Sequence, residues 1–124
     1  MNRLDFTDRR AVVTGGAAGI GLAIAQRLHA GGARLSLWDR DTAALASAAA
    51  TLSSAHTVAL DVADADAVDA AARGAATALG GIDVLVCSAG ITGPNTSVEA
   101  YPVAEWRRVF DFNVDGFLYC NRAV

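Results

Sequence analysis

Three glycines at the end of a short apolar run are the residues of this 124-residue sequence whose spacing points most directly to chemistry. Gly15, Gly19 and Gly21 follow the run at 11–14 and open a segment, 19–30, whose apolar residues recur at helical spacing. The first amides of a helix have no partner within it and lie at the positive end of its dipole, so they bind phosphate groups. Glycines there let the chain turn sharply, let a phosphate approach the backbone and let the helix pack closely. The pattern predicts a phosphate-binding turn; the alternative is a glycine-rich turn that merely connects a strand to a helix.

An aspartate supplies the second half of this pattern. Asp39 follows the next apolar segment, 34–38. A carboxylate at that place accepts hydrogen bonds from both hydroxyls of a ribose, and its charge repels a phosphate on the 2′ position. Together with the glycine turn, it predicts a dinucleotide site that takes NAD in preference to NADP. Arg40 keeps NADP open, because a guanidinium can hold a 2′-phosphate; the plainer alternative pairs Asp39 with Arg40 at the surface.

Alternating strand and helix signals surround these residues. Strands are expected at 10–14, 34–38, 57–60 and 82–87, and helices at 19–30, 42–52, 65–79 and 103–124. Asp41, Asp64 and Pro102 are expected to begin the second, third and fourth of these helices. The first helix is expected to bury the stripe Ile20, Ala23, Ile24 and Leu28. Short apolar strands separated by helices pair in parallel, with both faces of the sheet covered. Right-handed crossovers then give the order 3-2-1-4, an incomplete version of the Rossmann-like, doubly wound α/β sheet.

The composition bounds the class of protein. With 53% hydrophobic and 19% charged residues, residues 1–124 are expected to fold as a single domain. Ten basic and 13 acidic residues give a net charge of −3, and the scattered arginines form no basic stripe, which argues against nucleic acid. No apolar run suits a membrane span or a signal peptide. The two cysteines form no Cys-x-x-Cys pair, so free thiols and a cytoplasmic location are expected.

No metal site is expected. His29 and His56 have no cysteine or acidic partner at the spacing of metal ligands. Asp64, Asp66 and Asp69 resemble a cluster of carboxylates, but helical spacing spreads them over a solvated face.

Four motifs, in order along the chain, carry a resemblance to a known family. They are the run Thr14-Gly15-Gly16-Ala17-Ala18-Gly19-Ile20-Gly21, the pair Asp61-Val62, the run Ser88-Ala89-Gly90, and Asn113 within Phe112-Asn113-Val114-Asp115-Gly116. With these motifs the chain resembles the N-terminal portion of short-chain dehydrogenase/reductases, especially 3-oxoacyl carrier-protein reductases and sugar or polyol dehydrogenases. The resemblance implies that the first run holds the cofactor diphosphate, that Asp61 and Val62 contact the adenine, and that Ala89 and Gly90 approach the ribose on the nicotinamide side. Cys87-Ser88 departs from the family's pair of asparagines. Two interpretations of Ser88 therefore stay open: direct contact with the cofactor, and packing at the end of the strand.

The same resemblance implies hydride transfer between a nicotinamide cofactor and a carbonyl or secondary alcohol of a small molecule. In the family a Tyr is the general acid and base, a nearby Lys lowers its pKa, a Ser orients the carbonyl, and an Asn holds a water in a proton relay. Only the Asn has a counterpart here, Asn113, and the sequence contains no lysine. The Ser and Tyr-x-x-x-Lys segments are therefore expected beyond Val124, and residues 1–124 alone are expected to be inactive. Two alternatives stay open: a dinucleotide-binding module without chemistry, and an interaction protein that associates with complete homologues.

The last expected helix, Val103–Val124, has two apolar stripes. One consists of Val103, Trp106, Phe110, Val114, Phe117 and Leu118; the other consists of Val109, Phe112, Gly116, Cys120 and Ala123. One stripe suffices for contact with the sheet, so the other is free to meet a partner subunit. The resemblance implies a homo-oligomer through this helix. The equally open alternative is that the second stripe meets a further part of the same chain.

Overall fold

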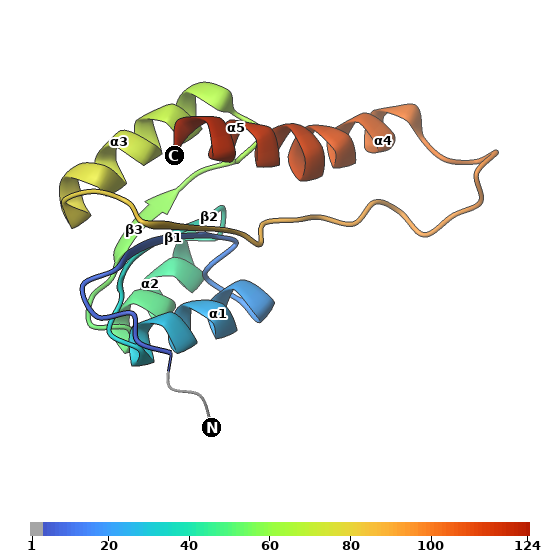
Figure 1. Ribbon diagram of the computed structural model, residues 1–124. Helices are drawn as coiled ribbons and strands as arrows, with labels where there is room; N and C mark the ends of the chain where they lie inside the picture. Colours follow the sequence, from blue (N-terminus) through green and yellow to red (C-terminus); the bar gives the residue numbers. More distant parts are fainter. Residues whose placement is uncertain (1–3) are drawn as a thin grey trace.

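Four short parallel strands occupy the centre of the molecule, between two layers of helices (Figure 1). The computed structural model describes residues 4–124. The strands are β1 (Arg10–Thr14), β2 (Arg34–Asp39), β3 (His56–Ala59) and β4 (Val84–Cys87), and their order is β3-β2-β1-β4. All three pairings are parallel, and Val12 at the centre of β1 lies opposite Ser36 on one side and Leu85 on the other. The predicted strand order, and with it the incomplete doubly wound sheet, is confirmed.

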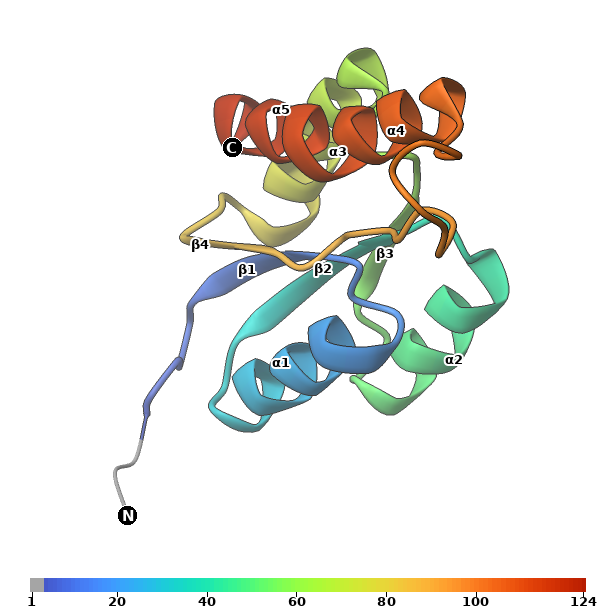
Figure 2. The same ribbon diagram turned by 90° about the vertical axis from the view of Figure 1, so that its right-hand side faces the viewer.

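Two helices cover each face of the sheet. In Figures 1 and 2, α1 (Gly19–Ala30) and α2 (Thr42–Thr51) lie below the sheet, and α3 (Ala65–Leu79) and α5 (Gly116–Ala123) lie above it. Two helix starts agree with the predicted caps. The Asp41 carboxylate accepts from the Ala44 amide at 2.9 Å, and the Asp64 carboxylate accepts from the Ala67 amide at 3.1 Å.

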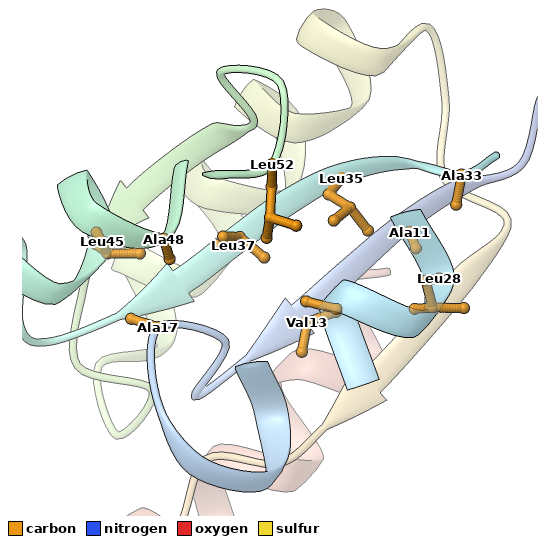
Figure 3. Close-up of a cluster of buried hydrophobic side chains, with 11 residues drawn as sticks. Ala11, Val13, Ala17, Leu28, Ala33, Leu35, Leu37, Leu45, Ala48 and Leu52 are labelled. Atoms are coloured by element: carbon orange, nitrogen blue, oxygen red, sulfur yellow. The ribbon is translucent and has the colours of Figure 1, made fainter. Parts of the chain in front are cut away.

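The alternation of side chains along the strands divides the buried residues into two cores. Leu35 and Leu37 of β2 point to α1 and α2, as Figure 3 shows. Trp38 of the same strand points to the opposite face, where it packs with residues of α3 and with Phe112. Both strand faces are apolar because helices cover both, as expected for a parallel sheet.

Strand β4 is shorter than predicted: it begins at Val84 rather than Ile82. The reason lies in Asp83, whose carboxylate accepts from the Arg10 amide at 2.9 Å and from the Arg10 guanidinium at 2.9 and 3.0 Å. The Arg10 guanidinium also donates to the carbonyl of Gly80. The Arg10 amide is therefore bonded to a side chain rather than to a backbone carbonyl, while the Asp83 amide donates to the Arg10 carbonyl at 2.8 Å.

The last helix is continuous, but it is not α-helical throughout. It consists of α4 (Val103–Phe110), the π-helical turn η1 (Asp111–Asp115) and α5 (Gly116–Ala123). The expected uninterrupted helix over Val103–Val124 thus misses a π turn, which apolar spacing alone does not reveal. Among residues 4–124, no helix combines the length and the apolar character that crossing a membrane requires.

Candidate functional site

A cleft of about 360 Å³ lies beyond the carboxyl ends of the strands. This is the edge at which open parallel sheets bind their ligands. Its lining brings together ten of the residues that the sequence singled out, namely Gly15, Gly19, Ile20, Gly21, Asp39, Arg40, Val62, Ser88, Ala89 and Gly90. The rest of the lining consists of Ala18, Trp38, Leu60, Ile91 and Phe112.

The three glycines of the turn are each required for a different physical reason. Gly15 has a φ of +61°, and a Cβ there would stand 2.9 Å from the backbone nitrogen of Ala89. Gly19 has a φ of +56°, and a Cβ there would have nothing within 4 Å, so its surroundings are open. A Cβ on Gly21 would collide with the carbonyl oxygen of Gly15. The turn therefore brings strand, helix and the 88–90 segment together and leaves its middle glycine bare to the cleft.

The start of α1 carries no side-chain cap. Its N-cap residue, Ala18, offers no acceptor, and the first turn has no acidic residue. Ile20 is 77% exposed on the cleft, whereas Gly21, Ala25 and Leu28 form the buried face. The expected buried stripe is therefore wrong at Ile20, which lines the cleft, and at Ala23, which is exposed. Amides without a side-chain partner at the positive end of a helix are suited to an anion.

Asp39 lies at the carboxyl end of β2, beside this helix start. One carboxylate oxygen accepts from the Ala17 amide at 3.2 Å, and the other accepts from the Asp41 amide at 3.1 Å. The two bonds tie the carboxylate to the glycine turn on one side and to the start of α2 on the other. The alternative of a surface pair between Asp39 and Arg40 is not what the structure has, because Arg40 stacks on Phe112 with its guanidinium carbon 4.8 Å from the ring centroid.

Thr14 and Asp61 lie outside the lining of the cleft. The hydroxyl of Thr14, which is buried, accepts from the Ala89 amide at 3.1 Å and so ties β1 to the 88–90 segment. Asp61 is exposed, and its carboxylate accepts from the Ala63 amide at 2.9 Å, which closes the turn after β3. Both residues therefore hold backbone next to the cleft without lining it.

Asn113 reaches the cleft only through its neighbour. Its side-chain oxygen accepts from the Ile91 amide at 2.8 Å, and its side-chain nitrogen donates to the Ile91 carbonyl at 2.8 Å. Asn113 therefore fastens the 90–92 segment to the π turn η1. π turns occur often at functional sites, where they redirect side chains.

Both cysteines border a cavity of about 60 Å³ that Asn113 also lines. Burial raises the pKa of the Cys87 thiol, and the Asn121 amide group that donates to its sulfur at 3.6 Å opposes this shift. Burial and, secondarily, the nearby Cys87 raise the pKa of Cys120 to about 12. Both thiols are free, and at neutral pH both are protonated and poorly nucleophilic.

Sequence reasoning missed Leu60, Ile91 and Phe112 as lining residues. Leu60 and Ile91 directly neighbour expected site residues, so their position beside a motif was the available signal. The sequence places Phe112 in one of the two apolar stripes of the last helix without showing which stripe is buried, and the structure buries Phe112, which is 6% exposed. Its second contact, with Arg40, emerges only from the fold.

Comparison with known proteins decides the family. A family model described as short chain dehydrogenase matches residues 9–124. The chain belongs to the short-chain dehydrogenase family.

Relatives of this short-chain dehydrogenase include enzymes named for sugar-related substrates. The 2-dehydro-3-deoxy-L-rhamnonate dehydrogenase (NAD(+)) of Sphingomonas sp. (strain SKA58) is 49% identical over 119 residues, which cover 96% of this chain and 48% of the relative. The galactitol 2-dehydrogenase (L-tagatose-forming) of Cereibacter sphaeroides is 44% identical over 115 residues, which cover 91% of this chain and 44% of the relative.

Solved structures of the family superpose closely on this short-chain dehydrogenase. An NAD+-bound xylitol dehydrogenase gives a TM-score of 0.94 at 32% identity, covering 98% of this chain and 48% of the other. A glucose/ribitol dehydrogenase from Brucella melitensis gives a TM-score of 0.92 at 37% identity, covering 98% and 53%. The chain thus spans about half the length of the curated relatives it matches.

Proposed function

We propose that the cleft binds a nicotinamide dinucleotide, NAD in preference to NADP, and that the protein is an oxidoreductase acting on a CH–OH group or carbonyl of a small sugar-like molecule. The observation that carries this proposal is the presence of two complementary features in one cleft. An uncapped helix start suits the diphosphate, and a carboxylate tied to that same turn suits the adenosine ribose.

The residues of the cleft fit such a group. The bare Gly19 leaves the backbone accessible to a phosphate, and any side chain at Gly21 would push the helix away from the turn. Leu60 and Val62 supply apolar surface for the adenine, and the short residues Ser88, Ala89 and Gly90 leave room on the nicotinamide side. When bound, the cofactor would supply the hydride acceptor or donor that no amino-acid side chain provides.

The remaining expected site residues act as positioning groups in this proposal. Asn113 holds the backbone of Ile91 and so fixes the rim of the cleft at its nicotinamide end. Any role of Asn113 in a proton relay would be exerted at this same 90–92 segment. Thr14 holds Ala89, and Asp61 closes the turn that presents Val62 to the adenine. None of these three residues need touch the cofactor to matter for its binding.

A sugar acid or polyol is the substrate class that the relatives' names support, ahead of the 3-oxoacyl class. The proton-transfer step needs groups that these 124 residues do not contain, since the sequence has no lysine to assist a tyrosine. A second candidate function for residues 1–124 is that of a dinucleotide-binding unit without turnover, which includes association with complete homologues.

Titration of the purified protein with NADH and NADPH tests the proposal. Energy transfer from tryptophan to the reduced nicotinamide should reveal binding, with NADH bound more tightly. Oxidation of galactitol or a related polyol with NAD would support the enzyme, and binding without turnover would support the second candidate. Absence of binding by either nucleotide would overturn both.

We further propose that the protein is a cytoplasmic homo-oligomer. The first apolar stripe of the last helix is exposed in this structure, and it consists of Val103, Trp106, Phe110, Val114, Phe117 and Leu118. The second stripe is the one that packs inward, through Phe112, Gly116 and Cys120. Covering the exposed stripe with a second subunit would remove a continuous apolar surface from water. The two free thiols agree with a reducing compartment.

A further inference from the structure

A cation–π contact crosses one end of the cleft. The guanidinium of Arg40, directly after β2, lies over the ring of Phe112 in η1, at 4.8 Å from the centroid. Both residues line the cleft, and Phe112 also belongs to the buried core between the sheet and α3. The contact therefore joins the strand that carries Asp39 to the helix on the opposite wall.

Arg40 has two competing uses at this place. Among the described residues that line the cleft, Arg40 is the one cation and Asp39 the one anion. A guanidinium beside the ribose-binding carboxylate is the group that would hold a 2′-phosphate through paired hydrogen bonds. A guanidinium stacked on an aromatic ring keeps the N–H groups at its edge free, but it reaches a phosphate that lies away from the ring only by giving up that contact.

Phe112 is held more firmly than Arg40. The ring is 6% exposed within the core, whereas Arg40 is an exposed side chain that follows the end of a strand. The ring cannot follow the guanidinium toward the ribose without leaving its packing. The ring therefore fixes where Arg40 lies, and not the reverse.

We propose that Phe112 is a specificity-determining residue for the cofactor: its ring holds the Arg40 guanidinium on the helix side of the cleft and so withholds it from a 2′-phosphate. This inference rests on the proposed function of the cleft. Asp39 repels the 2′-phosphate, and Phe112 removes the cation that would offset this repulsion. Discrimination against NADP thus depends on a residue remote in sequence from the ribose carboxylate.

The test compares the dissociation constants of two adenosine probes, 5′-AMP and adenosine 2′,5′-bisphosphate, in the full chain. Their ratio isolates the 2′-phosphate, because any general damage to the adenine pocket weakens both probes alike. Phe112→Leu, or replacement of Phe112 by pentafluorophenylalanine, should shift the ratio toward the bisphosphate by about threefold to thirtyfold, the equivalent of one cation–π contact. In an Arg40→Ala background the same changes should leave the ratio unaltered.

Tyr119→Leu is the matched control. It removes the other cation–π contact of the same helix, between Arg122 and Tyr119 at 5.7 Å, away from the cleft lining, and should not move the ratio. An unchanged ratio in both Phe112 variants, or a shift that persists without Arg40, would overturn the inference. If the unaltered protein binds neither probe nor NADH, it is the proposed function that fails.

Discussion

At the scale of single residues, the glycine turn and Asp39 form the proposed cofactor site, and Asn113 and Arg40 make contacts that join distant parts of the chain at the cleft. Gly15, Gly19, Gly21 and Asp39 were predictable because turn geometry and ribose recognition admit few residue types at those places. Asn113 and Arg40 were singled out, but their partners, Ile91 and Phe112, lie 22 and 72 residues away along the chain. Local spacing contains no information about such pairs, since the fold alone brings them together.

Asp39 provides the sharpest test at this scale. Asp39→Asn should raise the dissociation constant of NADH about tenfold or more, since a hydrogen bond to a charged group contributes about 1.5–3 kcal/mol. NADPH should be weakened less, because the variant also removes the repulsion of its phosphate. Fluorescence titration measures both. Asp66→Asn, at an exposed position in the first turn of α3, serves as the control, and equal losses for both nucleotides would count against the ribose assignment.

At the scale of elements, capping residues and glycines predicted where the helices begin, but two features could not be predicted from the sequence. The π turn at Asp111–Asp115 keeps the apolar spacing of an ordinary helix, so periodicity does not reveal it. The late start of β4 comes from the clamp between Arg10 and Asp83, 73 residues apart. The buried face of α1 was also misjudged at Ile20, because an apolar residue that lines a ligand cleft looks like a core residue in sequence.

Glycine substitutions separate packing constraints from helix propensity. Gly21→Ala should destabilise the fold by roughly 1–3 kcal/mol, since its Cβ meets the backbone of Gly15. Gly74→Ala, within α3 and with nothing within 4 Å of its Cβ, should instead stabilise by about 0.5–1 kcal/mol. Urea unfolding of the two variants gives the comparison. Equal effects in both would argue against the close approach of α1 to the glycine turn.

The clamp between Arg10 and Asp83 predicts a pH dependence of stability. The hydrogen bonds from Arg10 lower the pKa of Asp83 to about 2, below its ordinary value of 3.8. Because the folded-state pKa is depressed, the contribution is fully present above pH 3.8 and is lost as the pH falls toward 2. Asp83→Asn should lower the urea midpoint of unfolding at pH 6. The difference in midpoint between the variant and the unaltered protein should become smaller as the pH falls below 3.8. A difference that does not change with pH would contradict the ionic character of the clamp.

At the scale of the whole molecule, the sheet order followed from general rules, whereas the role of the last helix did not. Short apolar strands and right-handed crossovers leave little choice but β3-β2-β1-β4. The sequence showed the two apolar stripes of the last helix, and the structure buries the stripe that contains Phe112, Gly116 and Cys120. Periodicity does not show what covers the exposed stripe, a second subunit or a further part of the same chain.

Leu118→Asp tests the proposed subunit contact. A charge at the C-terminal end of the exposed stripe should lower the mass measured by light scattering from that of an oligomer to that of a monomer, because a buried, unpaired carboxylate is costly. Gln26→Asp adds the same charge to an exposed position of α1, in the other helical layer, and should leave the mass unchanged. An oligomer that survives Leu118→Asp would show that the subunits meet through another surface.

The central claim is that the first amides of α1 receive the diphosphate of a dinucleotide while Asp39 receives its ribose. Amide chemical shifts of ¹⁵N-labelled protein, followed by NMR as NAD is added, test this most directly. We predict that the largest changes fall on Gly19, Ile20 and Gly21, with accompanying changes at Ala17 and Asp41, whose amides bond to the Asp39 carboxylate. Saturating NAD that leaves the amides of the glycine turn unmoved, or that shifts residues at the opposite end of the strands instead, would contradict the account.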